Sequence, residues 1–210
     1  MKKGLFITFE GIEGCGKSTQ AKLLYHHLRS KGYKCRLTHE PGGTPIGEDI
    51  RNILLDPHNR DMSVGAELLL FEASRAQLAR EVILPSLNKG IIVICDRFND
   101  STYAYQAYAG GVDKKIIRDM EKVSIGALNP DLTIFLDVDV KTGLSRAKKY
   151  DRIEKKSLDY HGRVRKGFLA LSREYPKRIK AIRPRGAIAA TQSLIQKTVE
   201  DVIQRYYRPR

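Results

Sequence analysis

The sequence predicts an α/β domain in three layers, with a central parallel β-sheet flanked by helices on both faces. Apolar strand-like runs and helical periodicities alternate along the whole 210-residue chain. The runs 91–94 and 133–136 are continuously apolar, as in parallel strands that are covered on both faces. No Pro/Ser-rich linker or internal repeat interrupts the alternation, so residues 1–210 are expected to form one domain.

The expected elements follow in order along the chain. A β-rich run over residues 5–9 precedes a glycine-rich turn and a helix over 18–29, which Gly32 would end as a C-cap glycine. Ser193 is the candidate N-cap of the last helix. Further strands are expected at 34–38, 91–95 and 132–138, and further helices at 66–88, 112–128, 158–174 and 194–206.

Composition favours a soluble globular chain, because 41% of the residues are hydrophobic and 30% are charged. No apolar run approaches the roughly 20 residues that span a bilayer, and Glu10 interrupts the apolar start, so neither a membrane anchor nor a signal peptide is expected. Cys15, Cys35 and Cys95 form no CxxC pair, which favours reduced thiols in a cytoplasmic protein over disulfides or a zinc site.

The formal net charge of +14 is compatible with nucleic acid, an anionic membrane surface or small polyanionic substrates as partners. A solvated basic surface without a partner explains the charge equally well. Lys and Arg exceed Asp and Glu most strongly after Lys141, so the last third of the chain holds most of the anion-attracting surface. Charge alone does not choose among these classes.

A phosphate-binding motif follows the first strand. Residues 11–18 match G-x-x-x-x-G-K-[ST] in full, between a predicted strand and a predicted helix, which disfavours a chance glycine-rich turn. The glycines let backbone N–H groups face phosphate oxygens, Lys17 should reach the β- and γ-phosphates of ATP, and Ser18 should ligate Mg²⁺. The expected nucleotide-binding residues are Gly11, Ile12, Glu13, Gly14, Cys15, Gly16, Lys17, Ser18 and Thr19. The motif predicts a P-loop NTPase fold and leaves the phosphoryl acceptor open.

An acidic and a basic residue directly follow the strand expected at 91–95. Residues just past the carboxyl ends of parallel strands face the ligand crevice of an open sheet. Asp96 there could hold Mg²⁺ or its water, and Arg97 could fork onto a phosphate. A surface ion pair at the start of a loop is the alternative, and the nearby P-loop disfavours it.

Three further segments are candidates for binding the acceptor. Phe71 and Arg75 lie four residues apart on one helix face, where they could stack on a base and bind its carbonyl edge. A core Phe beside a surface Arg is the alternative. The turn 40–44 follows a strand and the polar run 101–106 follows Asp96-Arg97, but ordinary polar loops would explain both.

Taken together, these segments resemble the bacterial thymidylate kinases. The resemblance runs over roughly residues 4–175 in the family's order. The matching segments are 9–19, 40–44 with Gly47, Glu48 and Arg51, 70–77, 96–98 with Ser101, 104–106, 151–154 and 163–165.

The resemblance implies roles for single residues in binding thymidylate (dTMP). Phe71 would stack on thymine and Arg75 would bind its O4 edge. Thr102 and Gln106 would contact the base, and Tyr105 would pack where a 2′-hydroxyl would lie, favouring deoxyribose.

The resemblance also implies a catalytic set. Arg97 would hold the acceptor phosphate, and Glu13 would lie near the sugar 3′-hydroxyl. Asp96 and Ser18 would organise Mg²⁺. With Lys17 and Arg152, the implied catalytic residues are Lys17, Arg97, Arg152, Glu13 and Asp96.

A basic segment at about 146–156 falls where the family carries a short lid over ATP. The P-loop has no arginine among its variable positions, so the lid would supply the cation that neutralises charge during transfer. Arg152 is the first candidate and Arg146 the second; a solvated charge run is the alternative. The lid is shorter than the bacterial pattern and carries lysines where arginines are common, and Lys cannot fork onto phosphate as Arg does.

The match departs from the family at two other places. His39 replaces the arginine usual before the Glu40-Pro41-Gly-Gly turn. Residues 188–193 resemble the family's last strand and turn, with Ala189 where Asp is typical, and 182–186 before them resemble an insertion.

We therefore expect MgATP-dependent phosphorylation of dTMP to dTDP by direct in-line transfer, in dTTP biosynthesis. The expected partners are ATP, dTMP and a second copy of the chain, joined through the apolar face of residues 68–79, with no nucleic acid and no membrane. Another nucleoside or nucleotide kinase is the nearest alternative. A nucleic-acid-associated P-loop ATPase is less favoured, since the chain shows no helix-turn-helix or zinc pattern.

Overall fold

The computed structural model describes residues 4–146, 151–184 and 186–207. Within this part of the chain, five parallel strands form one sheet in the order β2-β3-β1-β4-β5. The strands are β1 (Phe6–Glu10), β2 (Cys35–His39), β3 (Ile92–Asp96), β4 (Leu132–Leu136) and β5 (Ile179–Ile182). The central strands β1 and β4 are buried along their whole length, as parallel strands covered on both faces should be.

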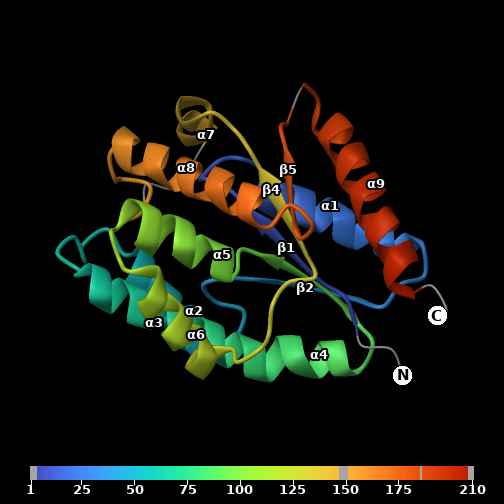
Figure 1. The fold of residues 1–210 in the computed structure, drawn as a ribbon, viewed down its shortest axis with the longest axis horizontal. Coiled ribbons are helices and arrows are strands. Elements are labelled where there is room, and N and C mark those ends of the chain that lie inside the picture. Colours follow the sequence, from blue (N-terminus) through green and yellow to red (C-terminus); the bar gives the residue numbers. More distant parts are fainter. Residues whose placement is uncertain (1–3, 147–150, 185, 208–210) are drawn as a thin grey trace.

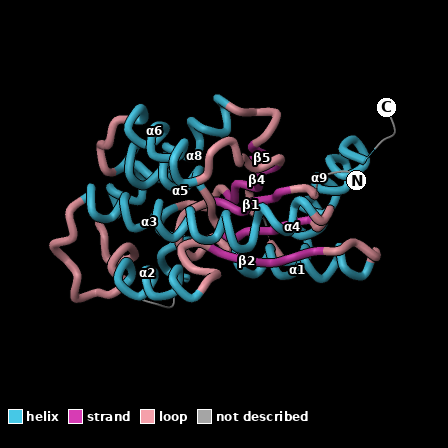
Figure 2. Tube along the Cα trace, turned by 90° about the horizontal axis from the view of Figure 1, so that it is seen from below, coloured by secondary structure: helices cyan, strands magenta, loops and turns pink. Residues whose placement is uncertain are grey.

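Helices cover both faces of the sheet, which gives the three layers that the sequence predicts (Figure 1). On one face, α1 (Lys17–Ser30) packs beside α9 (Ile188–Tyr207). The opposite face carries α4 (Leu84–Asn88), α5 (Asn99–Thr102) and α8 (Leu158–Glu174), and Figure 2 shows α4 in front of the strands and α1 behind them. On that face Phe168 of α8 stacks on Phe135 of β4.

The remaining helices pack on one another and on α4, α5 and α8. Helix α2 packs on α3, and α3 packs on α6. These elements are α2 (Pro45–Leu55), α3 (Val64–Leu78), the π-helical segments η1 (Ala79–Ile83) and η2 (Tyr103–Ala109), α6 (Lys114–Ser124) and α7 (Val140–Arg146). No helix in the described ranges is both long and apolar enough to cross a membrane.

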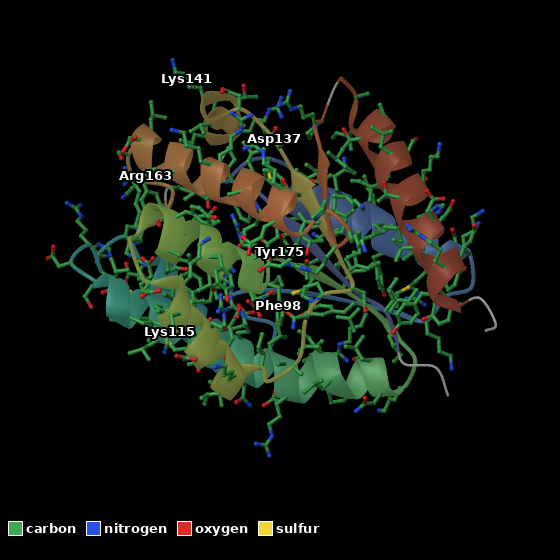
Figure 3. All side chains as sticks on the ribbon, in the orientation of Figure 1. Phe98, Lys115, Asp137, Lys141, Arg163 and Tyr175 are labelled. Carbon is green, nitrogen blue, oxygen red and sulfur yellow. The ribbon has the colours of Figure 1, made fainter. Side chains whose placement is uncertain are left out.

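Basic side chains gather at the periphery. Figure 3 shows Lys115, Lys141 and Arg163 pointing away from the molecule, whereas Phe98 lies in the interior. The side chain of Lys115 is 78% exposed and pairs with a neighbour on its own helix, Asp119. Such exposed charges contribute to the net charge without defining a binding site.

The four strands expected from the sequence are confirmed to within about two residues, the usual uncertainty of element boundaries. Helix α8 is confirmed at the bounds expected, 158–174. The expected helix 66–88 is present as α3, η1 and α4 in succession. In the first helix, Gly32 has φ +85°, the left-handed conformation of a glycine after a helix C-terminus.

The expectation for the C-terminal segment is wrong. Residues 188–193 begin α9 and form no strand, because Thr191 and Ile195 continue the buried stripe of the helix toward its N-terminus. Ser193 therefore lies inside the helix, where its Oγ donates to the carbonyl of Ala189 at 3.1 Å, and it is no N-cap. The last described strand is β5, which the sequence pattern does not predict.

Candidate active site

Three strands of the sheet end side by side at the P-loop. Gly11 follows β1, Glu40 follows β2 and Arg97 follows β3, and β1 pairs with β3, which pairs with β2. Parallel strands bring the segments after their carboxyl ends to one edge, so sequence positions far apart meet there.

The P-loop has the backbone that its glycines permit. Gly11 has φ +142° and Gly16, which caps α1, has φ +98°. A Cβ at Gly11 would lie 2.7 Å from the carbonyl oxygen of Leu136, so only glycine fits. The first turn of α1 carries no acidic residue, which leaves the positive end of the helix dipole free to favour an anion.

Lys17 lies over this loop. Its Nζ donates to the carbonyls of Gly11 at 3.1 Å and Ile12 at 2.8 Å. The carbonyls of Gly11 and Ile12 thus hold the side chain of Lys17. Residues 14–19 line a cavity of about 1190 Å³. This space, called the Arg146 cavity here, is also lined by Arg146, Thr191, Pro184 and Gly186.

Ser18 and Asp96 meet at the mouth of the loop. Ser18 Oγ donates to Asp96 Oδ2 at 2.5 Å, and Oδ1 of Asp96 is buried without a hydrogen-bond partner among the described residues. Mg²⁺ prefers oxygen ligands and keeps several waters and phosphate oxygens, so a hydroxyl and a carboxylate suit it. The described residues hold no cluster of three or more His, Cys, Asp or Glu side chains for a metal, so the remaining ligands would be those waters and phosphate oxygens.

A second cavity, called the Phe71 cavity here, has a volume of about 580 Å³ and adjoins the P-loop. It shares Lys17, Ser18 and Arg51 with the Arg146 cavity, so the two spaces meet at the loop. Its wall includes all six residues that the sequence assigns to the acceptor: Phe71, Arg75, Arg97, Thr102, Tyr105 and Gln106.

Arg97 occupies a backbone conformation that non-glycine residues rarely adopt, with φ +73°. Its Nη1 donates to the carbonyl of Gly11 at 2.9 Å and its Nη2 to Glu13 Oε1 at 3.0 Å. The guanidinium also lies over the ring of Tyr105, 5.1 Å from the ring centre. These contacts fix a cation between the P-loop and the Phe71 cavity.

Glu13 is the anion of this group. Its Oε1 also accepts from the hydroxyl of Tyr105 at 2.5 Å. Burial tends to raise the pKa of the Glu13 carboxyl, but contact with His161 and the charges of Arg97 and Lys17 outweigh burial and hold the pKa well below its usual range. Glu13 is therefore ionised at neutral pH.

Arg75 is the most completely buried charged side chain of the site, with 1% of its surface exposed. Its Nε donates to Glu40 Oε2 at 2.9 Å, and its Nη1 donates to Glu72 and to Thr102 Oγ1, the latter at 2.8 Å. Burial raises the pKa of Glu40 to about 8, although Arg75 opposes the shift. The sequence alternative of a surface arginine at position 75 is therefore wrong; Phe71, one turn earlier, is half-buried in the cavity wall.

The polar run 101–106 is helical. Thr102 ends α5, and Tyr105 and Gln106 lie in η2, buried toward the Phe71 cavity. Gln106 Nε2 donates to Glu67 Oε1 at 2.8 Å. The sequence allows a loop as the alternative for residues 101–106. Their apolar residues do not recur at helical spacing, so the pattern does not predict the helix.

Arg152 is placed differently from its predicted role as the catalytic cation. Its Nη1 pairs with Glu67 Oε2 at 2.6 Å and its Nε donates to the carbonyl of Leu54 at 2.8 Å. Arg152 is not among the described residues that line either cavity. In this structure it ties the segment 151–156 to α2 and α3, whereas Arg146 lines the cavity at the P-loop. Residues 147–150 of the expected lid lie outside the described residues.

Several residues of the site were not singled out from the sequence. Asp151 and Glu154 line both cavities, and burial beside Asp151 raises the pKa of Glu154 to about 7. Both belong to the segment 151–154 that carries the family resemblance. Glu67 and His161 carry no local signal, because a lone Glu or His on a helix is usually an ordinary surface residue.

Comparison with known proteins agrees with this arrangement. Residues 9–195 match the family model described as thymidylate kinase. The chain is 44% identical over 206 residues to a thymidylate kinase of Symbiobacterium thermophilum, covering 97% of this chain and 96% of that protein. It is 48% identical over 183 residues to a thymidylate kinase of Trichlorobacter lovleyi, covering 83% and 86%.

A solved structure shows the same fold. The crystal structure of thymidylate kinase from Ehrlichia chaffeensis superposes with a TM-score of 0.79 at 35% identity, covering 94% of this chain and 99% of that chain. The family model and the relatives span most of the sequence, including the P-loop and every residue that lines the Phe71 cavity. This chain belongs to the thymidylate kinase family.

Proposed function

We propose that this chain transfers the γ-phosphoryl group of ATP to dTMP, giving dTDP and ADP, as a step of dTTP biosynthesis. The observation that carries the proposal is the meeting of two cavities at one P-loop. One holds the complete set of side chains that would recognise a thymidine monophosphate, and the other is lined by the phosphate-binding loop itself.

Base recognition follows from the buried side chains. Arg75 is held in one orientation by Glu40, Glu72, Thr102 and the carbonyl of Phe98, so the N–H of Nη2 that these bonds leave over would be a fixed donor to a base carbonyl. Phe71 supplies an apolar face for stacking. A cytosine would offer an amino group where Arg75 needs an acceptor, and the unpaired donors would disfavour it.

The sugar would lie beside Tyr105, whose hydroxyl is held by Glu13 at 2.5 Å. A ring fixed in this way would pack where a 2′-hydroxyl would lie, as the family resemblance implies, and would favour deoxyribose as the sugar. Arg97, anchored to Gly11 and Glu13, would bind the acceptor phosphate.

Transfer itself requires positioning and charge neutralisation more than proton removal, because the attacking phosphate oxygen is already ionised. Lys17 and the N-terminus of α1 would neutralise the donor phosphates. Ser18 and Asp96 would hold Mg²⁺, which would supply positive charge against the donor phosphates. Arg146 is our proposed lid cation ahead of Arg152, because it faces the P-loop while Glu67 holds Arg152.

We also propose that the chain works as a homodimer in the cytoplasm, without nucleic acid as a partner. The outer faces of α2 and α3 carry exposed apolar side chains: Ile46, Ile53, Val64 and Leu69. Leu69, 62% exposed, lies within the face expected to join the two copies. Sedimentation at micromolar concentration should give twice the monomer mass, and Leu69→Glu should shift the chain toward monomer.

A panel of nucleoside monophosphates tests the function. With MgATP, dTMP should be turned over with the highest kcat/KM, dUMP less well, and dCMP and dGMP by a factor of 100 or more below dTMP, on the order expected when a buried donor loses its partner. Good turnover of dCMP or dGMP beside none of dTMP would contradict the substrate assignment.

A further inference from the structure

His161 is a fully buried histidine that the activity described above does not use. It lies in the second turn of α8, with 0% of its side chain exposed. Its Nδ1 lies 3.2 Å from Oε2 of Glu13, across 148 positions of sequence. Among the described residues, the two ring nitrogens of His161 form no hydrogen bond of good geometry. The same is true of Oε2 of Glu13.

In the described part of the chain, neither Oε2 of Glu13 nor the His161 ring has another hydrogen-bond partner, although Glu154 also interacts electrostatically with the His161 ring. A buried polar group without a partner costs about 1–3 kcal/mol, so a donor and an acceptor facing one another at 3.2 Å would be expected to pair. The pairing assigns the proton to Nδ1, because a carboxylate that is held ionised can only accept. The tautomer is thereby fixed by Glu13.

The other oxygen of Glu13 connects this pair to the acceptor side of the site. Oε1 accepts from Arg97 at 3.0 Å and from Tyr105 at 2.5 Å. Glu13 lines the Phe71 cavity and is not among the described residues that line the Arg146 cavity. A change in the orientation of the Glu13 carboxylate would thus displace Arg97 and Tyr105, which line the Phe71 cavity. It would change the Arg146 cavity less, because Glu13 is not among the described residues that line it.

We propose that His161 is a positioning residue for the acceptor: its Nδ1–H holds Oε2 of Glu13, so that Oε1 keeps Arg97 and Tyr105 in place. Helix α8 follows directly on the segment 151–156, so the same contact joins the base of the lid to the tip of the P-loop. The identity of the acceptor rests on the proposed function. The role of His161 rests on its contact with Glu13.

Three variants separate positioning from packing. His161→Leu removes the donor. His161→Asn keeps an N–H at the position of Nδ1 in a smaller side chain. Val164→Ala is the matched control, because Val164 is also 0% exposed on α8 but has no polar atom to offer Glu13. The unaltered chain is assayed first on the monophosphate panel, where failure of dTMP contradicts the proposed function; the variants are then compared on the best acceptor.

The expected result is that the KM of the acceptor changes much more than the KM of ATP. His161→Leu should raise the KM of the acceptor about tenfold or more while the KM of ATP changes less than about threefold, the size expected for one lost bond to a charged group. His161→Asn should recover most of the acceptor KM, and Val164→Ala should lower the melting temperature without changing one KM more than the other. Equal acceptor KM in His161→Leu and the unaltered chain, or no recovery in His161→Asn, would overturn the proposal.

A second measurement does not depend on the folding of the leucine variant. Nitrogen-15 NMR of the unaltered chain, with the His161 signal assigned by its loss in His161→Asn, should show a proton on Nδ1. A His161 ring protonated at Nε2 alone would contradict the proposed contact.

Discussion

At the scale of single residues, the proposed recognition of the acceptor would depend on one arginine that two acidic side chains hold. Arg75 is 1% exposed, and its partners Glu40 and Glu72 are 5% and 4% exposed. Glu72 in turn accepts from Ser124 of α6 at 2.5 Å, so the orientation of Arg75 is fixed from both sides. A planar guanidinium can serve several acceptors in one plane at the same time, which an ammonium group cannot do.

Arg75→Lys should separate charge from geometry. The lysine keeps a cation near Glu40 and Glu72 but loses the fork, so kcat/KM for dTMP should fall by a factor on the order of 100 while the fold persists. Arg80→Lys is the control, since Arg80 is exposed on the same helical stretch. Steady-state kinetics with both variants checks this; dTMP kinetics of Arg75→Lys equal to those of Arg80→Lys would contradict the role of the fork.

Glu10 gives the stability a pH dependence. Burial, with Asp100 nearby, raises the pKa of the Glu10 carboxyl from 4.5 to about 7, although Arg97 opposes the shift. The unfolded chain then loses the proton at a lower pH than the folded chain does. Stability should therefore fall as pH rises from about 4.5 to about 7 and level off above, by up to about 3 kcal/mol from this group.

Glu10→Gln should reduce that slope, because the amide cannot ionise and can still serve Phe98 N and Ser101 Oγ, while Glu154 continues to contribute. Denaturant unfolding at pH 5, 6 and 7 measures it. Asp49→Asn, which removes an exposed carboxylate, is the control and should leave the slope unchanged. An identical slope in Glu10→Gln and the unaltered chain would contradict the assignment.

At the scale of elements, α8 and η2 pack together at the wall of the Phe71 cavity that Tyr105 forms. The hydroxyl of Tyr160 on α8 donates to the carbonyl of Tyr105 at 3.3 Å. Gly167 of α8 lies so close to η2 that an added Cβ would stand 2.9 Å from the Cβ of Tyr108. Gly162 on the same helix has no atom within 4 Å of such a Cβ.

The two glycines give a matched prediction. Gly167→Ala should destabilise the fold by about 1–3 kcal/mol, because α8 and η2 must separate to admit the methyl group. Gly162→Ala should stabilise it by about 0.4–1 kcal/mol, since alanine favours a helix and meets nothing. Denaturant unfolding of both variants tests the pair, and a stable Gly167→Ala would show that the contact between α8 and η2 is loose.

The elements also show what the sequence could predict. Strands β1, β3 and β4 are continuous apolar runs, and α8 has a clear helical period, so all four were found. Strand β5 has only four residues, and its lysine and alanine carry a weak strand signal. Helix α2 and segment η2 were missed because their site-facing residues break the apolar pattern that reveals a helix.

At the scale of the whole molecule, the P-loop could be predicted because its chemistry lies in eight consecutive residues. The proposed acceptor set is spread over α3, the loop after β3, α5 and η2, and no local pattern shows that these segments share a cavity; resemblance to the family supplied the link. Pairs such as Glu13 with His161 or Glu67 with Arg152 depend on packing between elements far apart in the sequence, so only the structure reveals them.

Phosphorus-31 NMR of the unaltered chain with ATP, Mg²⁺ and dTMP tests the central claim most directly, because it follows where the phosphoryl group goes. The two cavities that meet at the P-loop predict that dTDP and ADP appear in equal amounts, with negligible inorganic phosphate. Release of inorganic phosphate from ATP while dTMP stays unchanged would contradict phosphoryl transfer and indicate an ATPase.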